Sequence, residues 1–255
     1  MKNEHTTRQK APAGRYALLD ELRGLDLISM MLYHACWDLM FLFGIRMDWY
    51  AGMPGHLWQQ TICWVFILLS GFCAPFGRHM LRRGVIVFAA GALVTAVTLV
   101  FMPGNWVIFG VLTFLGTAML LTGVLEPLLK KVMPAVGFAV SAVLFAVCYP
   151  VGLGWVGLGG WKLMLPQSLY ANYFTAFFGF YPDWFYSGDY FGLLPWLFLF
   201  WAGYYLHKAV GRRRMEPLRH SVCPSLGWMG RHSLLLYLLH QPVIYGVLSA
   251  AALFS

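Results

Sequence analysis

The stretch that decides the fold class is LRGLDLISMMLYHACWDLMFLFGI, residues 22–45. A helix needs about 20 apolar residues to cross the ~30 Å hydrocarbon core of a bilayer, and this stretch is long enough. It nevertheless contains Arg23, Asp26, His34 and Asp38. Ionisable side chains at such depth are costly, so they usually face a protein interior and serve a function. The stretch therefore predicts a membrane-spanning helix that carries a functional site.

The chain as a whole has the composition of an integral membrane protein. Hydrophobic residues make up 60% of the 255 residues and charged residues only 11%, whereas ordinary soluble domains are about 25% charged. The predicted fold is an all-α, polytopic membrane helix bundle of about seven transmembrane helices. We expect these helices over residues 18–45, 57–77, 84–103, 106–125, 133–153, 190–208 and 233–254.

The net charge of +8 does not indicate nucleic-acid binding, because the basic residues alternate between loops. Lys and Arg concentrate in the N-terminal tail and in the second, fourth and sixth loops. Arg46 and Lys162 lie in the intervening loops, and Arg23 lies at the start of the first helix. By the positive-inside rule, the N-terminus is cytoplasmic and the C-terminus is outside.

The sequence predicts one transmembrane domain, residues 17–255, preceded by a basic cytoplasmic tail, residues 1–16. The loop over residues 154–189 lies outside and is rich in aromatic residues, glycine and proline. Since Trp and Tyr favour the membrane interface, we expect short helices or a lid on the outer surface. The loop either simply rests on that surface or shapes an acceptor site.

His34 and Asp38 form the first candidate catalytic pair. They are four residues apart, which places them on one helical face within reach of each other. A carboxylate beside an imidazole can hold its tautomer and raise its basicity, as general-base and nucleophilic catalysis both require. The alternative is a histidine that is merely satisfied within the bundle.

Arg23 has Asp20 and Asp26 as neighbours, each three residues away. A local ion pair that neutralises the charge is one explanation. The other is an anchor for an anionic ligand that enters from the cytoplasm.

The last predicted helix contains a second polar group, in GRHSLLLYLLHQPVIYG, residues 230–246. Arg231, His232 and Ser233 stand at its start, where free amide groups and the helix dipole favour phosphate or carboxylate. His240 and Gln241 follow ~10 Å deeper.

Pro242 cannot donate to the carbonyl of Leu238, so a kink and a free acceptor beside His240 are expected. Proline kinks also occur in purely structural spans. Asp189, at the outer edge of the sixth helix, either orients a polar or cationic acceptor or caps that helix.

Other site classes are disfavoured. No two of the eight histidines are three or four residues apart, and the five cysteines include no CxxC pair, so no metal site is predicted. Hydrolase, phosphate-loop and dinucleotide motifs are absent. A small-molecule or proton-coupled transporter is the main alternative to an enzyme, although no inverted repeat is visible. A scaffold protein with residual polar pairs is a third possibility.

Several segments resemble one family: DELRGLDLISMMLYHACWDL, WVFILLSGF, RRGVIVFAAGALVTAVT, VIFGVLTFLGTAMLL, DYFGLLPW and MGRHSLLLYLLHQP. In order, they are similar to the bacterial heparan-alpha-glucosaminide N-acetyltransferase catalytic-domain-like proteins, within the transmembrane acyltransferases. The likeness runs from about residue 15 to residue 246 and is weakest in the fifth span and the outer loop. Many relatives read FGILH where this chain has FGVLT, which puts Thr113 in the position of a histidine.

The resemblance implies transfer of an acetyl group from cytosolic acetyl-CoA to an extracytoplasmic amino sugar or similar amine or hydroxyl acceptor. His34 would be the base or the acetyl carrier, and Asp38 its partner. If the histidine that Thr113 replaces helps catalysis in relatives, its role here is either missing or carried out by His240. The other matching positions imply donor binding by Arg23, Arg231, His232 and Ser233, and acceptor binding by Asp189 and Gln241. The resemblance further implies a bacterial plasma-membrane location among lipids, and a homodimer is the default assembly.

Overall fold

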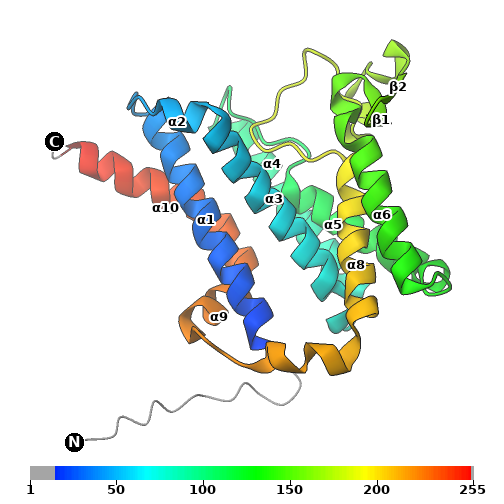
Figure 1. The fold of residues 1–255 in the computed structure, drawn as a ribbon. Coiled ribbons are helices and arrows are strands. Elements are labelled where there is room, and N and C mark those ends of the chain that lie inside the picture. Colours follow the sequence, from blue (N-terminus) through cyan, green and yellow to red (C-terminus); the bar gives the residue numbers. More distant parts are fainter. Residues whose placement is uncertain (1–14, 254–255) are drawn as a thin grey trace, which may run out of the picture. The chain divides into compact units, whose positions relative to one another are not determined.

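The structure is a computed structural model that describes residues 15–253, and it is predominantly helical (Figure 1). Most of the predicted tail, residues 1–14, lies outside the described residues. The all-α prediction is therefore confirmed in its main feature. The exceptions are two short strands, β1 and β2, over Trp155–Leu158 and Trp161–Met164.

Five helical segments are long and apolar enough to cross a membrane, and each corresponds to a predicted span. They are Met53–Phe76, Met80–Phe101, Val111–Leu129, Pro134–Leu153 and Ser233–Leu253. The two remaining predicted spans, over residues 18–45 and 190–208, overlap with α1 (Ala17–Phe41) and α8 (Leu193–Met215). Acidic residues in α1 and the Trp, Tyr, His and Lys residues of α8 lower their hydropathy, so the number seven stays a prediction.

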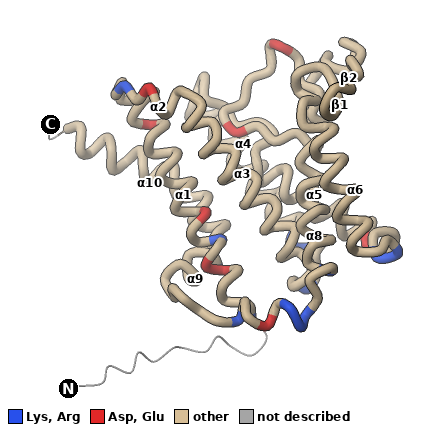
Figure 2. The backbone as a smooth tube through the Cα atoms, viewed as in Figure 1, with Lys and Arg blue, Asp and Glu red and all other residues tan. Residues whose placement is uncertain are grey.

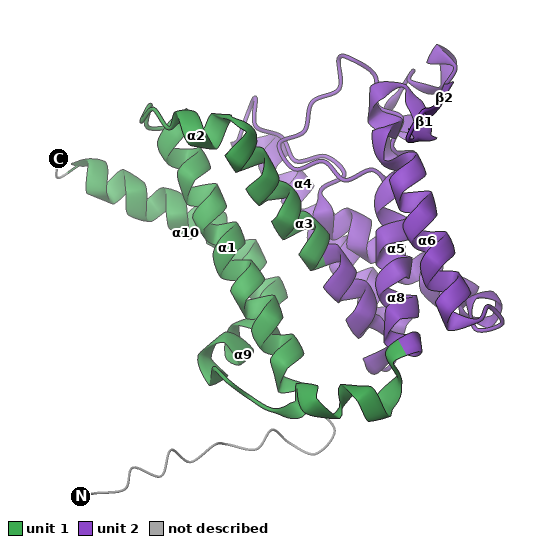
Figure 3. Cartoon of the chain, in the orientation of Figure 1, with its two compact units in different colours: residues 1–66, 210–255 green, residues 67–209 purple. Residues whose placement is uncertain are grey.

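The chain divides into two compact units, drawn in Figure 3. Unit 1 comprises the chain up to Phe66 and from Val210 onward, and unit 2 comprises Ile67–Ala209. The boundaries fall within α3 (Met53–Cys73) and α8.

Unit 1 is built on α1, whose inner face packs against the two last helices of the chain. It contains, besides α1 and the first part of α3, the elements α2 (Asp48–Ala51), η4 (Glu216–Arg219), α9 (Pro224–Arg231) and α10 (Ser233–Leu253). Figure 2 marks in blue the basic residues at the start of this C-terminal part, where Arg212, Arg213 and Arg214 form the last turn of α8.

Two glycines let α1 and α9 approach each other closely. A Cβ atom added to Gly24 of α1 would collide with the backbone carbonyl of Leu226 in α9. In the reverse direction, a Cβ atom added to Gly230 of α9 would collide with the backbone carbonyl of Asp20 in α1. The absence of a side chain at both positions therefore sets the separation of the two helices.

Unit 2 packs its helices around aromatic and small residues such as Phe114, Ala118, Phe200 and Tyr204, all of which are buried. Its helices α4 and α5 lie against each other along most of their length. The elements of unit 2, besides the parts of α3 and α8, are η1 (Ala74–Phe76), α4 (Met80–Phe101), α5 (Val111–Leu129), α6 (Pro134–Cys148), η2 (Tyr149–Leu153), β1, β2, η3 (Gln167–Leu169) and α7 (Tyr173–Phe178).

The aromatic loop over residues 154–189 contains both expected and unexpected structure. The short helices η3 and α7 agree with the prediction, and Asn172 begins α7 with a capping box that it shares with Thr175. The unexpected part is an antiparallel hairpin in which Trp155 pairs with Met164. Its sequence signal is Gly159–Gly160 between two segments of Trp, Val, Leu and Met.

Candidate active site

The two predicted polar groups of the first and last helices meet inside unit 1. The rings of His34 on α1 and His240 on α10 face each other, with centroids 4.8 Å apart and planes inclined by 60°. One turn further along α1, the Asp38 carboxylate accepts a hydrogen bond of 2.6 Å from the amide nitrogen of Gln241. Four of the predicted site residues thus form two cross-helix pairs.

Asp38 has a different partner from the one expected. The sequence pairs Asp38 with His34, but the hydrogen bond that the structure gives Asp38 goes to Gln241. The Asp38 side chain is completely buried, with no exposed surface. The carboxylate therefore joins α1 to α10. His34 instead has its contact across the two helices with the ring of His240.

His240 has its tautomer set by the backbone. Its Nδ1 atom lies 2.5 Å from the carbonyl oxygen of Tyr237. A carbonyl can only accept, so Nδ1 carries the hydrogen and donates it. In the neutral ring the lone pair is then on Nε2, the nitrogen that can act as a base.

An aromatic cluster that the sequence reasoning missed surrounds the residue before His34. The Tyr33 ring lies 4.9 Å from the Tyr50 ring and 5.3 Å from the Trp58 ring, centroid to centroid. Tyr50 donates a hydrogen bond to the Tyr33 carbonyl, and Trp58 donates one of 2.8 Å to Ser29. These contacts hold α1 against α2 and α3 at the level of His34. Their sequence signal was the aromatic run MDWYAGMPGHLW, residues 47–58.

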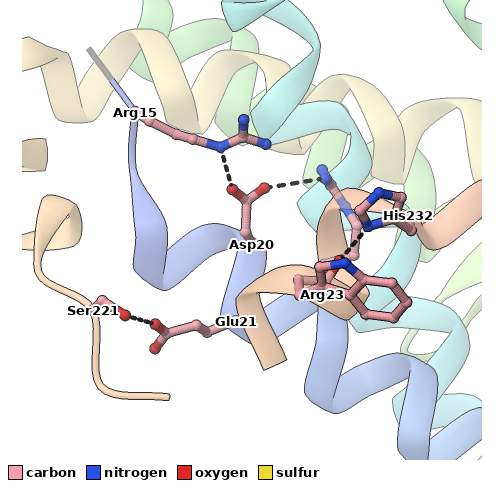
Figure 4. Close-up of polar contacts among 7 residues, drawn as sticks. Arg15, Asp20, Glu21, Arg23, Ser221 and His232 are labelled. Atoms are coloured by element: carbon pink, nitrogen blue, oxygen red, sulfur yellow. Dashed lines mark hydrogen bonds and ion pairs between the residues drawn. The ribbon is translucent and has the colours of Figure 1, made fainter. Parts of the chain in front are cut away.

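Arg23 forms the local ion pair that was one of its two predicted roles. It lies 3.8 Å from a carboxylate oxygen of Asp20, and Arg15 contacts the other oxygen at 2.7 Å (Figure 4). Because two guanidinium groups share one carboxylate, the triad keeps a net positive charge. That charge suits an anionic ligand as well as a structural pair.

Glu21 is a buried residue of α1 that no sequence pattern singled out. Its carboxylate accepts a hydrogen bond of 2.6 Å from the Ser221 hydroxyl (Figure 4). The Val222 amide also donates to this carboxylate, at 3.1 and 3.0 Å from its two oxygens. These bonds tie the turn that precedes α9 to the first turns of α1.

Arg231, His232 and Ser233 lie at the junction of α9 and α10. α9 ends at Arg231, and α10 begins at Ser233, as predicted for the last span. His232 closes α9: its Nδ1 lies 2.9 Å from the carbonyl of Trp228, and its ring lies 4.5 Å from the indole (Figure 4). His232 therefore lies directly before the start of α10, as the donor-binding role requires. Its contacts with Trp228 also give it a structural role at the end of α9.

Asp189 lies in unit 2 and caps a helix other than its own. Its carboxylate accepts a hydrogen bond of 3.2 Å from the amide of Val111, the first residue of α5. Capping was the structural alternative predicted for Asp189, although for the helix that became α8. The binding role stays a prediction.

Thr113 also lies in unit 2, on α5, and is buried. A Cβ atom added to Gly91 of α4 would lie 2.6 Å from the Thr113 hydroxyl oxygen, so the two helices are tightly packed here. The tight packing therefore favours a small side chain at Thr113. Over residues 15–253, no three His, Cys, Asp or Glu side chains come together as a candidate metal site.

Comparisons with known proteins identify the family. No curated protein and no solved structure matches the chain. One family model, described as heparan-alpha-glucosaminide N-acetyltransferase, catalytic, matches residues 15–242. The match contains α1, α9 and the part of α10 that carries His240 and Gln241. The chain therefore belongs to the heparan-alpha-glucosaminide N-acetyltransferase catalytic family.

Proposed function

We propose that the protein moves an acetyl group from cytosolic acetyl-CoA to an amine or hydroxyl acceptor on the other side of the membrane. Membership in the family implies N-acetyltransferase activity, with acetyl-CoA as donor and an amine as acceptor. The five apolar helices indicate an integral membrane protein. The observation that carries the proposal is the contact between the rings of His34 and His240, at 4.8 Å.

Two reaction routes use these rings. In the first, His34 removes a proton from the acceptor while the acceptor nitrogen or oxygen attacks the thioester carbonyl; the C–S bond breaks, and the CoA thiolate takes up a proton. In the second, a ring nitrogen of His34 attacks the carbonyl itself. The C–S bond breaks and an acetyl-imidazole forms, from which the acceptor then takes the acetyl group.

His240 complements His34 in both routes. The backbone carbonyl of Tyr237 fixes its hydrogen on Nδ1, which leaves Nε2 as the basic nitrogen. His240 can therefore accept the proton that the acceptor loses when His34 is acetylated. This supports the assignment of both histidines as catalytic residues. Asp38 would hold Gln241, and with it the neighbouring His240 of α10, in place.

The donor is proposed to bind at the start of α1 and of α10. Acetyl-CoA carries phosphate groups, which guanidinium groups and helix N-termini bind well. Arg23 and Arg231 would supply charge, and His232 and Ser233 would supply hydrogen-bond donors. The shared carboxylate of Asp20 leaves positive charge available at Arg23 and Arg15.

The proposed topology has seven spans, with α1 and α8 added to the five apolar segments, a cytoplasmic N-terminus and an outside C-terminus. From Arg23 to His34 the helix rises by ~16 Å, about half the hydrocarbon core. The donor would thus approach α1 from the cytoplasmic side of the membrane and the acceptor from the outer side. Asp189 and Gln241 are each proposed as acceptor-binding residues.

We further propose that residues 17–255 act as one transmembrane domain in a bacterial plasma membrane, surrounded by lipid. Two copies would form a homodimer, the most common closed assembly.

The experiment is a transfer assay on purified protein in detergent. It uses radiolabelled acetyl-CoA, a panel of amino sugars and small amines, and the variants His34→Ala and His56→Ala. His56 is an exposed histidine of α3 and serves as the matched control. We expect CoA release and label transfer in the wild type and in His56→Ala, and their loss in His34→Ala. Absence of CoA release in the wild type, together with amine flux into sealed vesicles without acetyl-CoA, would instead establish a transporter.

A further inference from the structure

The pair of Asp38 and Gln241 presents acceptor atoms that have no donor. Asp38 Oδ2 and Gln241 Oε1 are buried, and neither has a hydrogen-bond partner among the described residues. Native structures leave few buried polar atoms unsatisfied, and each such atom calls for a donor that binds there.

The chemistry of the pair fixes which atoms are left over. The structure places the amide nitrogen of Gln241 against Asp38, where it donates to the carboxylate. The amide oxygen of Gln241 cannot exchange places with that nitrogen without losing the bond. Both remaining atoms are therefore acceptors, and together they select a ligand with several hydrogens to donate.

A third acceptor lies on the same turn of α10. Pro242 has no N–H group, so the carbonyl of Leu238 lacks its usual helical donor. In a helix the carbonyl of Leu238 points toward the amide position of Pro242, the residue that follows Gln241.

The geometry points to this cluster, defined as Asp38, Gln241 and the Leu238 carbonyl, as the binding site for the protonated amino group of the acceptor. One negative charge and two neutral oxygens match a primary ammonium, which has one positive charge and three N–H donors. A hydroxyl group offers a single donor and no charge. The inference rests on the proposed function, because that function makes the bound amine the acetyl acceptor.

The site also accounts for the order of the chemical steps. His34 and His240 lie next to the cluster, since His34 is one turn before Asp38 and His240 immediately precedes Gln241. A histidine takes one proton from the ammonium, which becomes a neutral amine with a free lone pair. The amine nitrogen forms a bond to the acetyl carbon as the C–S or acetyl–imidazole bond breaks, and its second proton passes to the leaving CoA thiolate or to the released imidazole. The product amide has no charge and one N–H, so it binds the cluster less well and leaves.

The two side chains of the cluster differ in exposure. Asp38 is completely buried, whereas Gln241 is partly exposed and the neighbouring Pro242 is exposed. Gln241 holds the Asp38 carboxylate through its amide nitrogen, which makes Gln241 a positioning residue for the amine.

The test compares binding and turnover of glucosamine with those of glucose, which carries a hydroxyl in place of the amino group. Binding is measured as the increase in thermal stability that each sugar causes without acetyl-CoA. The KM for each sugar is measured in the transfer reaction with acetyl-CoA present. The variants are Asp38→Asn, which removes the charge but keeps the shape, and Asp48→Asn as the control at an exposed aspartate. We expect Asp38→Asn to abolish the stabilisation by glucosamine and to raise its KM about tenfold or more, with glucose unaffected. Asp48→Asn should behave as the wild type.

Equal binding of glucosamine to Asp38→Asn and to the wild type, or equal effects on glucosamine and glucose, would overturn the inference. If Asp38→Asn does not fold, Gln241→Met takes its place, because methionine keeps the side-chain length and removes one acceptor. Glucosamine binding equal to that of the wild type, or equal effects on glucosamine and glucose, would then overturn the inference. Failure of the proposed function looks different. In that case glucosamine would still bind in an Asp38-dependent manner, but no acetyl group would be transferred.

Discussion

Gln241 donates a hydrogen bond of 2.6 Å to Asp38, although 203 positions separate them in the sequence. The bond holds the last helix against the first at the turn next to the contact of His34 with His240. The two helices thereby bring together candidate site residues from opposite ends of the chain. The predictions below test this site and the packing that supports it.

The two histidines should contribute unequally to acetyl transfer. Replacing His34 by Gln removes the base or carrier, and we expect kcat to fall about 100- to 10,000-fold. Replacing His240 by Gln should cost less, since it removes only the second base. Steady-state CoA release measures both, and His56→Gln is the control. Equal activity of His34→Gln and the wild type would contradict the assignment.

Gly230 should tolerate no side chain. Alanine there would meet the Asp20 carbonyl, so we expect Gly230→Ala to lower the free energy of unfolding by about 1–3 kcal/mol. Gly246 of α10 has open space around its position and provides the control, because Gly246→Ala should be neutral or stabilising. Heat-denaturation curves in detergent distinguish the two. Equal stability of both variants would show that α1 and α9 can separate without cost.

Glu21 should hold the turn before α9. Glu21→Ala leaves the Ser221 hydroxyl and the Val222 amide without their acceptor, at a cost of about 1–3 kcal/mol. Hydrogen exchange at residues 220–223 should increase as a result. Glu216→Ala is the matched control, because Glu216 forms only an exposed pair with Arg219. Unchanged exchange in Glu21→Ala would disprove the role of this carboxylate.

Asp189 should stabilise α5. Loss of its cap in Asp189→Ala should cost about 1 kcal/mol, whereas Asp183→Ala, at an exposed aspartate of the same loop, should have little effect. Thermal unfolding measures the cap. The predicted binding role adds a second readout, since a rise in KM larger in Asp189→Ala than in other variants of equal stability would establish acceptor binding.

Cys223 should react faster with alkylating reagents than an ordinary thiol. The hydrogen bond with Ser225, followed by the backbone amide of Leu226, lowers the pKa of the Cys223 thiol. More thiolate is then present near pH 7, because deprotonation occurs at lower pH. Ser225→Ala should raise the pKa and slow alkylation at pH 7, with the difference vanishing at high pH. Mass spectrometry of the Cys223 peptide measures the rate, and identical rates at pH 7 would rule out the effect.

The secondary structure was predictable where one property dominates a whole segment. Long apolar runs predict helices because a segment in hydrocarbon must satisfy its backbone hydrogen bonds internally, and five of these runs do form helices long and apolar enough to cross a membrane. The hairpin at Trp155–Met164 was missed, although Gly159–Gly160 was a usable signal, because aromatic residues at an interface suit helices and strands alike.

The candidate site was predictable only in part. The sequence indicated His34, Asp38, His240 and Gln241 as polar residues in apolar helices, since such residues are costly there. It paired Asp38 with His34, because helical periodicity relates only residues of one helix. It could not reveal the bond of Glu21 to Ser221 or the cap of α5 by Asp189.

The sequence by itself determined the class of the protein, the positions of its apolar helices, its family and the residues able to do chemistry. These follow from local properties, namely hydropathy, charge and motif, which each segment carries independently of its neighbours. Only the tertiary structure decided that Asp38 bonds to Gln241 and that His34 faces His240. Such pairs depend on how α1 packs against α10, that is, on contacts between segments far apart in the chain. Gly24 and Gly230 act in the same way between α1 and α9, whose separation they set.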